Sequence, residues 1–336
     1  MAKRATIKDV AALAGVSIAT VSNVFSGKKA VNADLARRVE QAAETLSYRL
    51  DRAASQLRSG KVQVTGMLVP NLDDIFFTSL VEQVERLANE DGYEILVASS
   101  RDDPEREVSR LNALLGWRPS GLIAVPCSNA IPQPIRSEIG RLPMVLADRV
   151  GEAGLPIDTV TMDNFAAGRE AAELLIQSHR DIVIAASHTA IRPIADRIAG
   201  ITSIYEARYG VKPRIVELTS SVNAGAEIFC EWLSRESRPE GVVCLTNVTT
   251  LATLQAFAAL SIDIPEDVSL IGFDDYTWMT ARKVPLSAVR QPIEEMAKAI
   301  WSCLSDRMAG SQAPTRNIVL PGSLQVRRSV RTLTPA

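Results

Sequence analysis

Residues 6–23 read TIKDVAALAGVSIATVSN, and this run predicts two short helices joined by a tight turn. Thr6 and Asp9 stand three residues apart, which is the spacing of a capping box at the start of a helix. Gly15 suits the left-handed conformation that ends a helix, and Ser17 can cap a second helix directly afterwards. Two short helices joined by a glycine-containing turn form a helix-turn-helix.

A third helix is predicted from Asn32, which follows the loop SGKKAV. The apolar residues of this segment recur at helical spacing and would close a small core: Leu35, Val39, Ala42 and Leu46. We therefore expect an all-α helix-turn-helix unit over residues 1–49. Residues 50–61 contain DRAASQLRSGK, and a helix of about eight residues there is too short to be stable alone in water. This segment is expected to be a linker, or hinge, that orders only on contact.

Charge is divided unevenly between this head and the rest of the chain. Residues 1–60 carry ten Lys or Arg and five Asp or Glu, whereas the remaining residues carry 27 and 34. A basic head on an acidic body suggests a polyanion as the partner of the head. Charge alone does not identify nucleic acid, since a charged run is usually a solvated surface.

Beyond Lys61 the sequence alternates short apolar strands with amphipathic helices. Two series follow one another, first VQVTGMLVP, YEILVAS, GLIAVPC and LPMVLAD, then DTVTM, DIVIAAS, PRIVELT, GVVCLT and VSLIGF. Continuous apolar strands with crossover helices predict parallel sheets that are covered on both faces. The expected fold is therefore α/β, with an all-α headpiece and a body of two doubly wound α/β lobes. A ligand would bind at the carboxyl ends of the strands.

Polar side chains stand at several strand ends and are candidates for binding a small molecule. Asp148 ends LPMVLAD, Asn247 ends GVVCLTN and Asp274 ends VSLIGFD. Arg197, in ADRIAG, lies near the start of a helix. Carboxylates and amides pair with sugar hydroxyls, and an arginine adds a fork that also suits a carboxylate on the ligand. No glycine-rich phosphate loop opens any helix, so nucleotide-phosphate chemistry has no support.

No constellation in the sequence selects a catalytic function. The two histidines, His179 and His188, have neither a recognisable nucleophile nor metal-ligand spacing, and the four cysteines are scattered. We expect no catalytic residue, no metal and no cofactor, although an enzyme that uses two cleft carboxylates stays open as the least favoured alternative. The sequence has no signal-peptide pattern and no run of about 18 apolar residues, so we expect a cytoplasmic protein that does not cross a membrane.

The segment from Thr6 to Tyr48 closely resembles the DNA-binding headpiece of the lactose-repressor (LacI/GalR) family of bacterial transcription regulators, above all in the frame DVA–AGVS–TVS. The resemblance implies that the second helix enters the major groove of double-stranded DNA. It places Ile18, Ala19 and Asn23 at the positions that set specificity, where the two apolar side chains can contact thymine methyl groups. Hydroxyl groups placed to reach phosphates or bases belong to Thr6, Ser17, Thr20 and Ser22.

The hinge segments of two subunits would, by the same resemblance, fold together in the minor groove. A leucine of that hinge wedges into the central base step and kinks the duplex. Leu57 in AASQLRSG matches this leucine, with Ala54 beside it. Apolar wedges of this kind exchange base stacking for a more extensive wrapped contact.

The body shows the same resemblance through DNFAAG, DRIAG, IPEDVSLIGFDD, PLSAVRQP and QVRRSV. It implies the fold of periplasmic sugar-binding proteins, with three strands crossing between the lobes. Residues 62–336 would form the effector-binding and dimerisation part. Its N-lobe would be about 62–162 and 292–322, and its C-lobe about 163–291 and 323–330.

The four polar candidates named above match positions that line the effector pocket of this family. Phe76 and Phe77 match its Asn-Pro-aromatic-aromatic stretch, where a ring can stack on the ligand or pack in the core, although the sequence here reads DDIFF. Val248 stands where the family usually has Asp. The effector is therefore expected to be a sugar or sugar derivative whose identity the sequence does not give.

These features predict a sequence-specific transcriptional regulator of the repressor type, controlled by an effector bound between two lobes. It would act as a homodimer on an approximately palindromic operator, because two helix-turn-helix units need two-fold symmetry. No leucine heptad follows QVRRSVRTLTPA, so the tetramerising tail of the lactose repressor itself is expected to be absent. A solute-binding protein without a DNA role is the other alternative, and the basic head argues against it.

Overall fold

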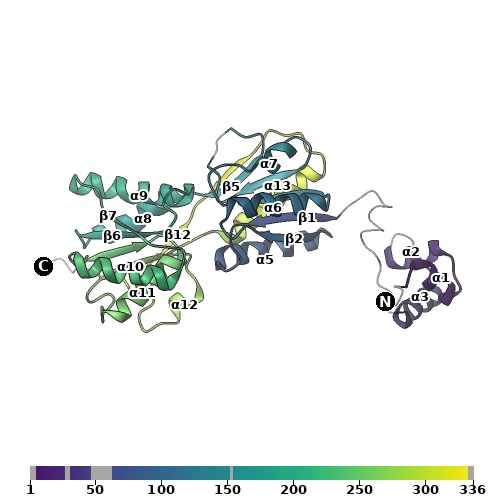
Figure 1. The fold of residues 1–336 in the computed structure, drawn as a ribbon, viewed down its shortest axis with the longest axis horizontal. Helices are drawn as coiled ribbons and strands as arrows, with labels where there is room; N and C mark the ends of the chain where they lie inside the picture. Colours follow the sequence, from purple (N-terminus) through teal and green to yellow (C-terminus); the bar gives the residue numbers. More distant parts are fainter. Residues whose placement is uncertain (1–4, 27–30, 47–62, 152–153, 332–336) are drawn as a thin grey trace. The chain divides into compact units, whose positions relative to one another are not determined.

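The computed structural model describes residues 5–26, 31–46, 63–151 and 154–331 (Figure 1). The chain divides into two compact units, Met1–Val62 and Gln63–Ala336.

The first unit contains α1 (Ile7–Ala14), α2 (Ile18–Ser26) and α3 (Ala33–Thr45). The predicted caps of the first two helices are confirmed. The backbone N–H and the hydroxyl of Thr6 each donate to Asp9 Oδ2 at 2.7 Å, and Gly15 ends α1 with φ 63°. The N–H of Thr20 donates to Ser17 Oγ at 3.1 Å. The axes of α1 and α2 differ by 104°, an angle typical of a helix-turn-helix.

Buried apolar side chains from all three helices form the core of this unit: Val10, Ala11, Ala14, Val21, Val39, Ala42 and Ala43. Arg38 of α3 donates to the carbonyl oxygen of Ala14 at 2.6 Å and so satisfies one of the acceptors left free at the end of α1. Among the described helices, no single one is long and apolar enough to cross a membrane; α1 and α2 meet that length and composition only as a bent pair.

The second unit is built on two six-stranded sheets. The first sheet is parallel throughout and has the order β11-β5-β4-β3-β1-β2. Its strands are β1 (Val64–Val69), β2 (Glu94–Ser99), β3 (Gly121–Ala124), β4 (Met144–Ala147), β5 (Asp158–Met162) and β11 (Asn317–Leu320). The second sheet has the order β12-β10-β9-β8-β6-β7, in which β12 is antiparallel to β10 and the other pairs are parallel. Its strands are β6 (Ile182–Ala186), β7 (Arg214–Glu217), β8 (Gly241–Cys244), β9 (Ser269–Phe273), β10 (Ser287–Arg290) and β12 (Ser323–Gln325).

Helices cover both faces of each sheet, which confirms the predicted α/β class. On the first sheet, α5 and α13 pack on one face and α6 and α7 on the other. On the second sheet, α8 and α9 lie opposite α10 and α11 (Figure 1). The bounds are α5 (Ile75–Glu90), α6 (Pro104–Gly116), α7 (Gln133–Glu138), α8 (Asn164–Ile176), α9 (Arg192–Tyr209), α10 (Val222–Arg235), α11 (Asn247–Ala259), α12 (Thr277–Thr280) and α13 (Ile293–Met308).

The chain passes from one sheet to the other three times, after β5, after β10 and after β11. We refer to the part built on the first sheet as the first lobe and to the part built on the second sheet as the second lobe. In the second lobe, α8 and α9 touch backbone to backbone. A Cβ at Gly168 would lie 2.3 Å from the carbonyl oxygen of Arg197, and one at Gly200 would lie 2.2 Å from that of Phe165. Only glycine fits so close an approach, and the contact fixes the backbone of Arg197 against α8.

Candidate effector pocket and DNA-binding helix

Two aspartates that end strands in different sheets line one cavity. Asp148 directly follows β4 of the first sheet, and Asp274 directly follows β9 of the second. Their φ angles are 56° and 83°, a region that residues other than glycine rarely adopt and that is enriched at functional sites. Both residues are buried. Burial raises the pKa of Asp148, although the positive charges of Arg149 and Arg197 act in the opposite direction.

Two protein groups hold the carboxylate of Asp274 in place. The backbone N–H of Asn247 donates to Oδ2 at 2.8 Å, and Gln291 Nε2 donates to Oδ1 at 2.5 Å. Gln291 lies where the chain crosses between the sheets after β10. Its Oε1 is buried, and no described residue donates a hydrogen bond to it. A buried acceptor of this kind costs free energy unless a water or a ligand supplies the missing donor.

Arg197 reaches the same cavity from α9 and is almost completely buried, with 3% of its surface exposed. Its Nε donates to Asn164 Oδ1 at 2.8 Å, and its Nη1 donates to the carbonyl oxygen of Leu245. The guanidinium carbon lies 4.2 Å from the centroid of the Phe273 ring. Burial lowers the pKa of Arg197, and the nearby carboxylates oppose that shift. The hydrogen bonds to Asn164 and Leu245 hold the positively charged guanidinium in one orientation.

A third carboxylate in the cavity belongs to Asp74, which caps the start of α5. Its Oδ1 accepts a hydrogen bond from the backbone N–H of Phe76 at 3.0 Å. Burial and then the negative charge of Asp274 raise the pKa of Asp74 to about 6. The positive charge of Arg149 and the hydrogen bond from Phe76 only partly offset this.

Phe76 and Phe77 belong to the apolar core under α5, and only 4% and 3% of their surfaces are exposed. The rings pack edge to face with centroids 5.1 Å apart, and both contribute to the cavity wall. The guanidinium of Arg149 lies 5.3 Å from the Phe77 centroid and pairs with Asp102. One face of Phe77 is therefore already covered by an arginine of the same lobe.

Asn247 is the first residue of α11, and both of its polar contacts are made within the protein. Its backbone N–H holds Asp274, and its Oδ1 accepts a hydrogen bond from Trp278 Nε1 at 3.2 Å.

The two histidines differ in their surroundings. His188 lines the cavity, whereas His179 is buried, with Nδ1 3.1 Å from the carbonyl oxygen of Leu175.

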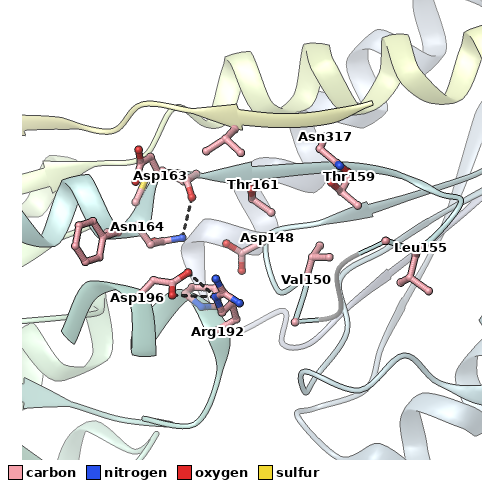
Figure 2. A pocket seen from close by; sticks show the side chains of 16 residues that line it. Asp148, Val150, Leu155, Thr159, Thr161, Asp163, Asn164, Arg192, Asp196 and Asn317 are labelled. Atoms are coloured by element: carbon pink, nitrogen blue, oxygen red, sulfur yellow. Dashed lines mark hydrogen bonds and ion pairs between the residues drawn. The ribbon is translucent and has the colours of Figure 1, made fainter. Parts of the chain in front are cut away.

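The cavity lined by the three carboxylates has a volume of about 60 Å³, and a second cavity of about 310 Å³ adjoins it. Asp148 lines both. Figure 2 shows Asp148 in the wall of the larger cavity, between Val150 and the ion pair of Arg192 with Asp196. Binding sites for small molecules usually start at about 300 Å³, so the larger cavity provides the room that the smaller one lacks.

In the first unit, α2 presents an uncharged surface. Ile18 is 43% exposed, and Ala19 and Ser22 are exposed beside it, while Asn23 is half-buried. An exposed isoleucine on such a surface can contact a thymine methyl group, and asparagine can pair with adenine.

The predicted hydroxyl groups of this unit are engaged in local bonds. Ser17 Oγ and Thr20 Oγ1 lie 2.9 Å apart, and the hydroxyl of Thr6 donates to Asp9. Ala54 and Leu57, predicted to act in the minor groove, lie outside the described residues.

Comparison with known proteins connects both surfaces to one family. Residues 6–51 match the family model of bacterial regulatory proteins of the lacI family, and residues 171–330 match a periplasmic binding protein-like domain. The transcriptional regulator PtxS of Pseudomonas plecoglossicida is 31% identical over 331 residues, which make up 97% of this chain and 96% of that protein. This chain belongs to the lacI family of bacterial regulatory proteins.

Two solved structures of regulators share the fold of this lacI-family chain. The lac repressor dimer bound to operator and the anti-inducer ONPF aligns with a TM-score of 0.82 at 24% identity, over 97% of this chain and 99% of that one. The complex of the transcriptional regulator CelR with cellobiose aligns with a TM-score of 0.71 at 25% identity, over 97% and 100%.

Membership of the lacI family decides between the functions considered for the sequence. The chain is a transcriptional repressor with an effector-binding domain, and it is neither a cleft enzyme nor a solute-binding protein without a DNA role. Five of the six predicted effector residues line one cavity, and Asn247 is not among its lining residues; the five are Phe76, Phe77, Asp148, Arg197 and Asp274. The structure adds Asp74 and Gln291, which the sequence did not identify. The sequence DDIFF could have identified Asp74, because it has an aspartate where the lacI family usually has an asparagine.

Proposed function

We propose that this protein represses transcription by binding an approximately palindromic operator as a homodimer, and that a small carbohydrate-like molecule bound between its lobes controls operator binding. The observation that carries the control by an effector is the convergence of residues from two lobes on one cavity. Asp148 comes from the first lobe, and Arg197 and Asp274 come from the second.

A ligand that contacts both lobes can act as a switch. The lobes are joined by three chain crossings, and a ligand that bonds to both stabilises the orientation in which both sets of groups are within reach. Only this difference in affinity between orientations can shift the equilibrium. Residues 50–61 join the head to the body, so the orientation of the lobes in a dimer would set the spacing of two hinge segments on DNA.

The candidate contacts with DNA are those of α2 and the hinge. Ile18, Ala19 and Asn23 would read base edges in the major groove, and the exposure of the first two supports this role. The hydroxyls of Thr6, Ser17, Thr20 and Ser22 would reach phosphates or bases, and Ala54 and Leu57 would enter the minor groove. The lac repressor dimer bound to operator supports operator binding by a dimer of this chain, which would act in the cytoplasm of a bacterium.

The candidate contacts with the effector are Asp148, Arg197 and Asp274, with Phe76 and Phe77 in the wall, whereas Asn247 acts through the backbone N–H that holds Asp274. The complex of CelR with cellobiose supports a carbohydrate-like ligand for this chain. Carboxylates and amides arranged around a cleft are suited to the hydroxyl groups of such a ligand.

Selection of duplexes from a randomised pool by the full-length protein tests the repressor function. We expect two inverted half-sites in the selected sequences and a dimer in sedimentation. The same protein is then screened by thermal shift against sugars, sugar acids, polyols and nucleosides, because a ligand that binds the folded state raises the melting temperature. Selected sequences without inverted symmetry, or bound ligands that leave operator affinity unchanged, would contradict the proposal.

A further inference from the structure

The pocket carries more negative charge than its arginines balance. Asp74, Asp148 and Asp274 come from three separate elements and line one cavity. Arg197 faces all three, but Arg149 is already paired with Asp102. The pKa of Asp74, raised to about 6 by burial and then by the charge of Asp274, shows that the pocket already resists the negative charge that it contains.

Some of the donors of the two arginines are already in use. Arg197 donates through Nε to Asn164 and through Nη1 to the carbonyl oxygen of Leu245. Arg149 donates through Nη1 to Asp102. The positive charge of Arg197 is already shared among Asp74, Asp148 and Asp274, so a ligand carboxylate would compete with three carboxylates of the protein for it.

Acceptor oxygens, by contrast, lack partners. Gln291 is 7% exposed and lines the cavity, and among the described residues none donates to its Oε1. No described residue donates a side-chain or backbone hydrogen bond to the carboxylate of Asp148, and Asp74 receives one on Oδ1 alone, from Phe76. The buried Oε1 of Gln291 requires a donor, and the carboxylate oxygens of Asp74 and Asp148 can accept further hydrogen bonds, so a ligand hydroxyl that replaces water in this cavity finds acceptors for its hydrogen.

We propose that the effector is an uncharged, hydroxyl-rich molecule, a polyol or neutral sugar, and that Asp74 makes the pocket reject the corresponding sugar acids. This inference rests on the proposed control by a ligand between the lobes. Each ligand hydroxyl would donate its hydrogen to an unpartnered oxygen of the cavity. A ligand carboxylate would bring a fourth negative charge beside three others in a site where water screens charges poorly.

Asp74 is the residue that sets this preference, because its charge can be removed without changing its shape. In the usual Asn-Pro form of the family an amide would stand here. Asn is as good an N-cap as Asp, so Asp74→Asn keeps the hydrogen bond from Phe76 that starts α5. Asp73 is exposed and adjacent, so Asp73→Asn removes the same charge outside the cavity and is the matched control.

The test measures the affinity of the full-length protein at pH 7.5 for matched pairs of compounds by calorimetry. The pairs are hexitols, pentitols, aldohexoses, aldopentoses and cellobiose, each with its aldonic or uronic acid. We expect at least one neutral compound to bind, with its acid at least about tenfold weaker. Asp74→Asn should reduce that ratio at least about threefold by improving the affinity for the acid, and Asp73→Asn should leave it unchanged.

Several outcomes would overturn this proposal: an acid that binds as tightly as its neutral partner, no binding by any neutral compound, or equal ratios for Asp74→Asn and the wild-type protein. Operator binding by the wild-type protein without ligand tests the proposed function separately. Its absence would overturn the repressor function, whereas a lost preference with operator binding intact would overturn only the role of Asp74.

Discussion

Asn129 of the first lobe binds the backbone of Arg192 in the second: its Oδ1 accepts a hydrogen bond from the N–H of Arg192 at 2.8 Å. Its Nδ2 donates to the carbonyl oxygen of Ala190 at 2.7 Å. Ala190 lies just before α9, and Arg192 is its first residue, so both bonds meet the helix that carries Arg197. One side chain thus joins the two lobes beside the cavity.

Asn129→Ala should weaken effector binding. The substitution removes both bonds between the lobes and so disfavours the orientation in which the cavity is formed. Two exposed hydrogen bonds contribute about 1 kcal/mol together, which corresponds to a loss of about fivefold in affinity. Calorimetric titration measures it. Gln133→Ala is the control, because Gln133 bonds within α7 of the first lobe; an equal loss in both variants would contradict a bridging role for Asn129.

Arg197→Ala should abolish the response to the effector while operator binding is retained. Loss of the guanidinium removes the positive charge among three carboxylates and a hydrogen-bonding fork, for a loss of at least about tenfold in effector affinity. Because the alanine variant also leaves Asn164 and Leu245 without their donor, Arg197→Lys, which keeps the charge, is measured beside it. Titrations of operator DNA with and without effector measure the response of each variant. An unchanged response in both variants would remove Arg197 from the pocket.

Leu57→Ala should weaken operator binding and leave effector affinity nearly intact. An apolar wedge acts only on the duplex, where it offsets the cost of unstacking a base step. Fluorescence anisotropy with operator DNA and calorimetry with the effector separate the two effects. Equal losses in both measurements would exclude the wedge.

Replacing thymine by uracil within the half-sites should reduce affinity by about fourfold for each methyl group that Ile18 or Ala19 contacts. The substitution removes one methyl group and leaves base pairing unchanged. The same replacement outside the half-sites serves as the control. Indifference to uracil at every position would mean that α2 does not read thymine through these side chains.

Asp74→Asn should stabilise the protein at neutral pH. The pKa of Asp74 is about 6 in the folded protein and 3.8 for the ordinary group, so folding favours the protonated form. The charge therefore opposes folding increasingly between about pH 4 and pH 6 and fully above that, by no more than about 3 kcal/mol. Melting temperatures at pH 7 and pH 4 should show a gain for the variant at pH 7 alone. Asp73→Asn should show no such difference, and equal shifts at both pH values would contradict this prediction.

Much of the fold follows from local patterns. The capping residues Thr6, Ser17 and Asn32 fix the helices of the head through bonds to neighbours in sequence, and nine strands of the body are continuous apolar runs. Three strands were not predicted as apolar runs: β10, β11 and β12. Only alternate residues of β11 are buried at all, at the edge of its sheet, and β12 has three residues, so neither stands out without the sheet that each joins.

The candidate site was predictable only where a residue ends a strand. Asp148 and Asp274 stand directly after apolar runs, and parallel strands bring such ends to one edge. Asp74 looks in the sequence like an ordinary helix cap, and Gln291 lies in a crossing segment before a proline. Asp74 and Gln291 line the same cavity because of how the two lobes close, and no local sequence pattern predicts that closure. Asn247 was expected to face the ligand as the end of a strand, and in the structure its amide faces Trp278.

The contact of α8 with α9 at Gly168 and Gly200 has a consequence for how such repressors diversify. This contact holds the main chain of Arg197 against α8 without using any side chain that lines the cavity. Asp74, Asp148 and Gln291, by contrast, stand on separate elements and can be exchanged one at a time. Residues at the cap of α5 and the end of β4 can then be exchanged, or redesigned, while the two glycines keep the main chain of Arg197 in place.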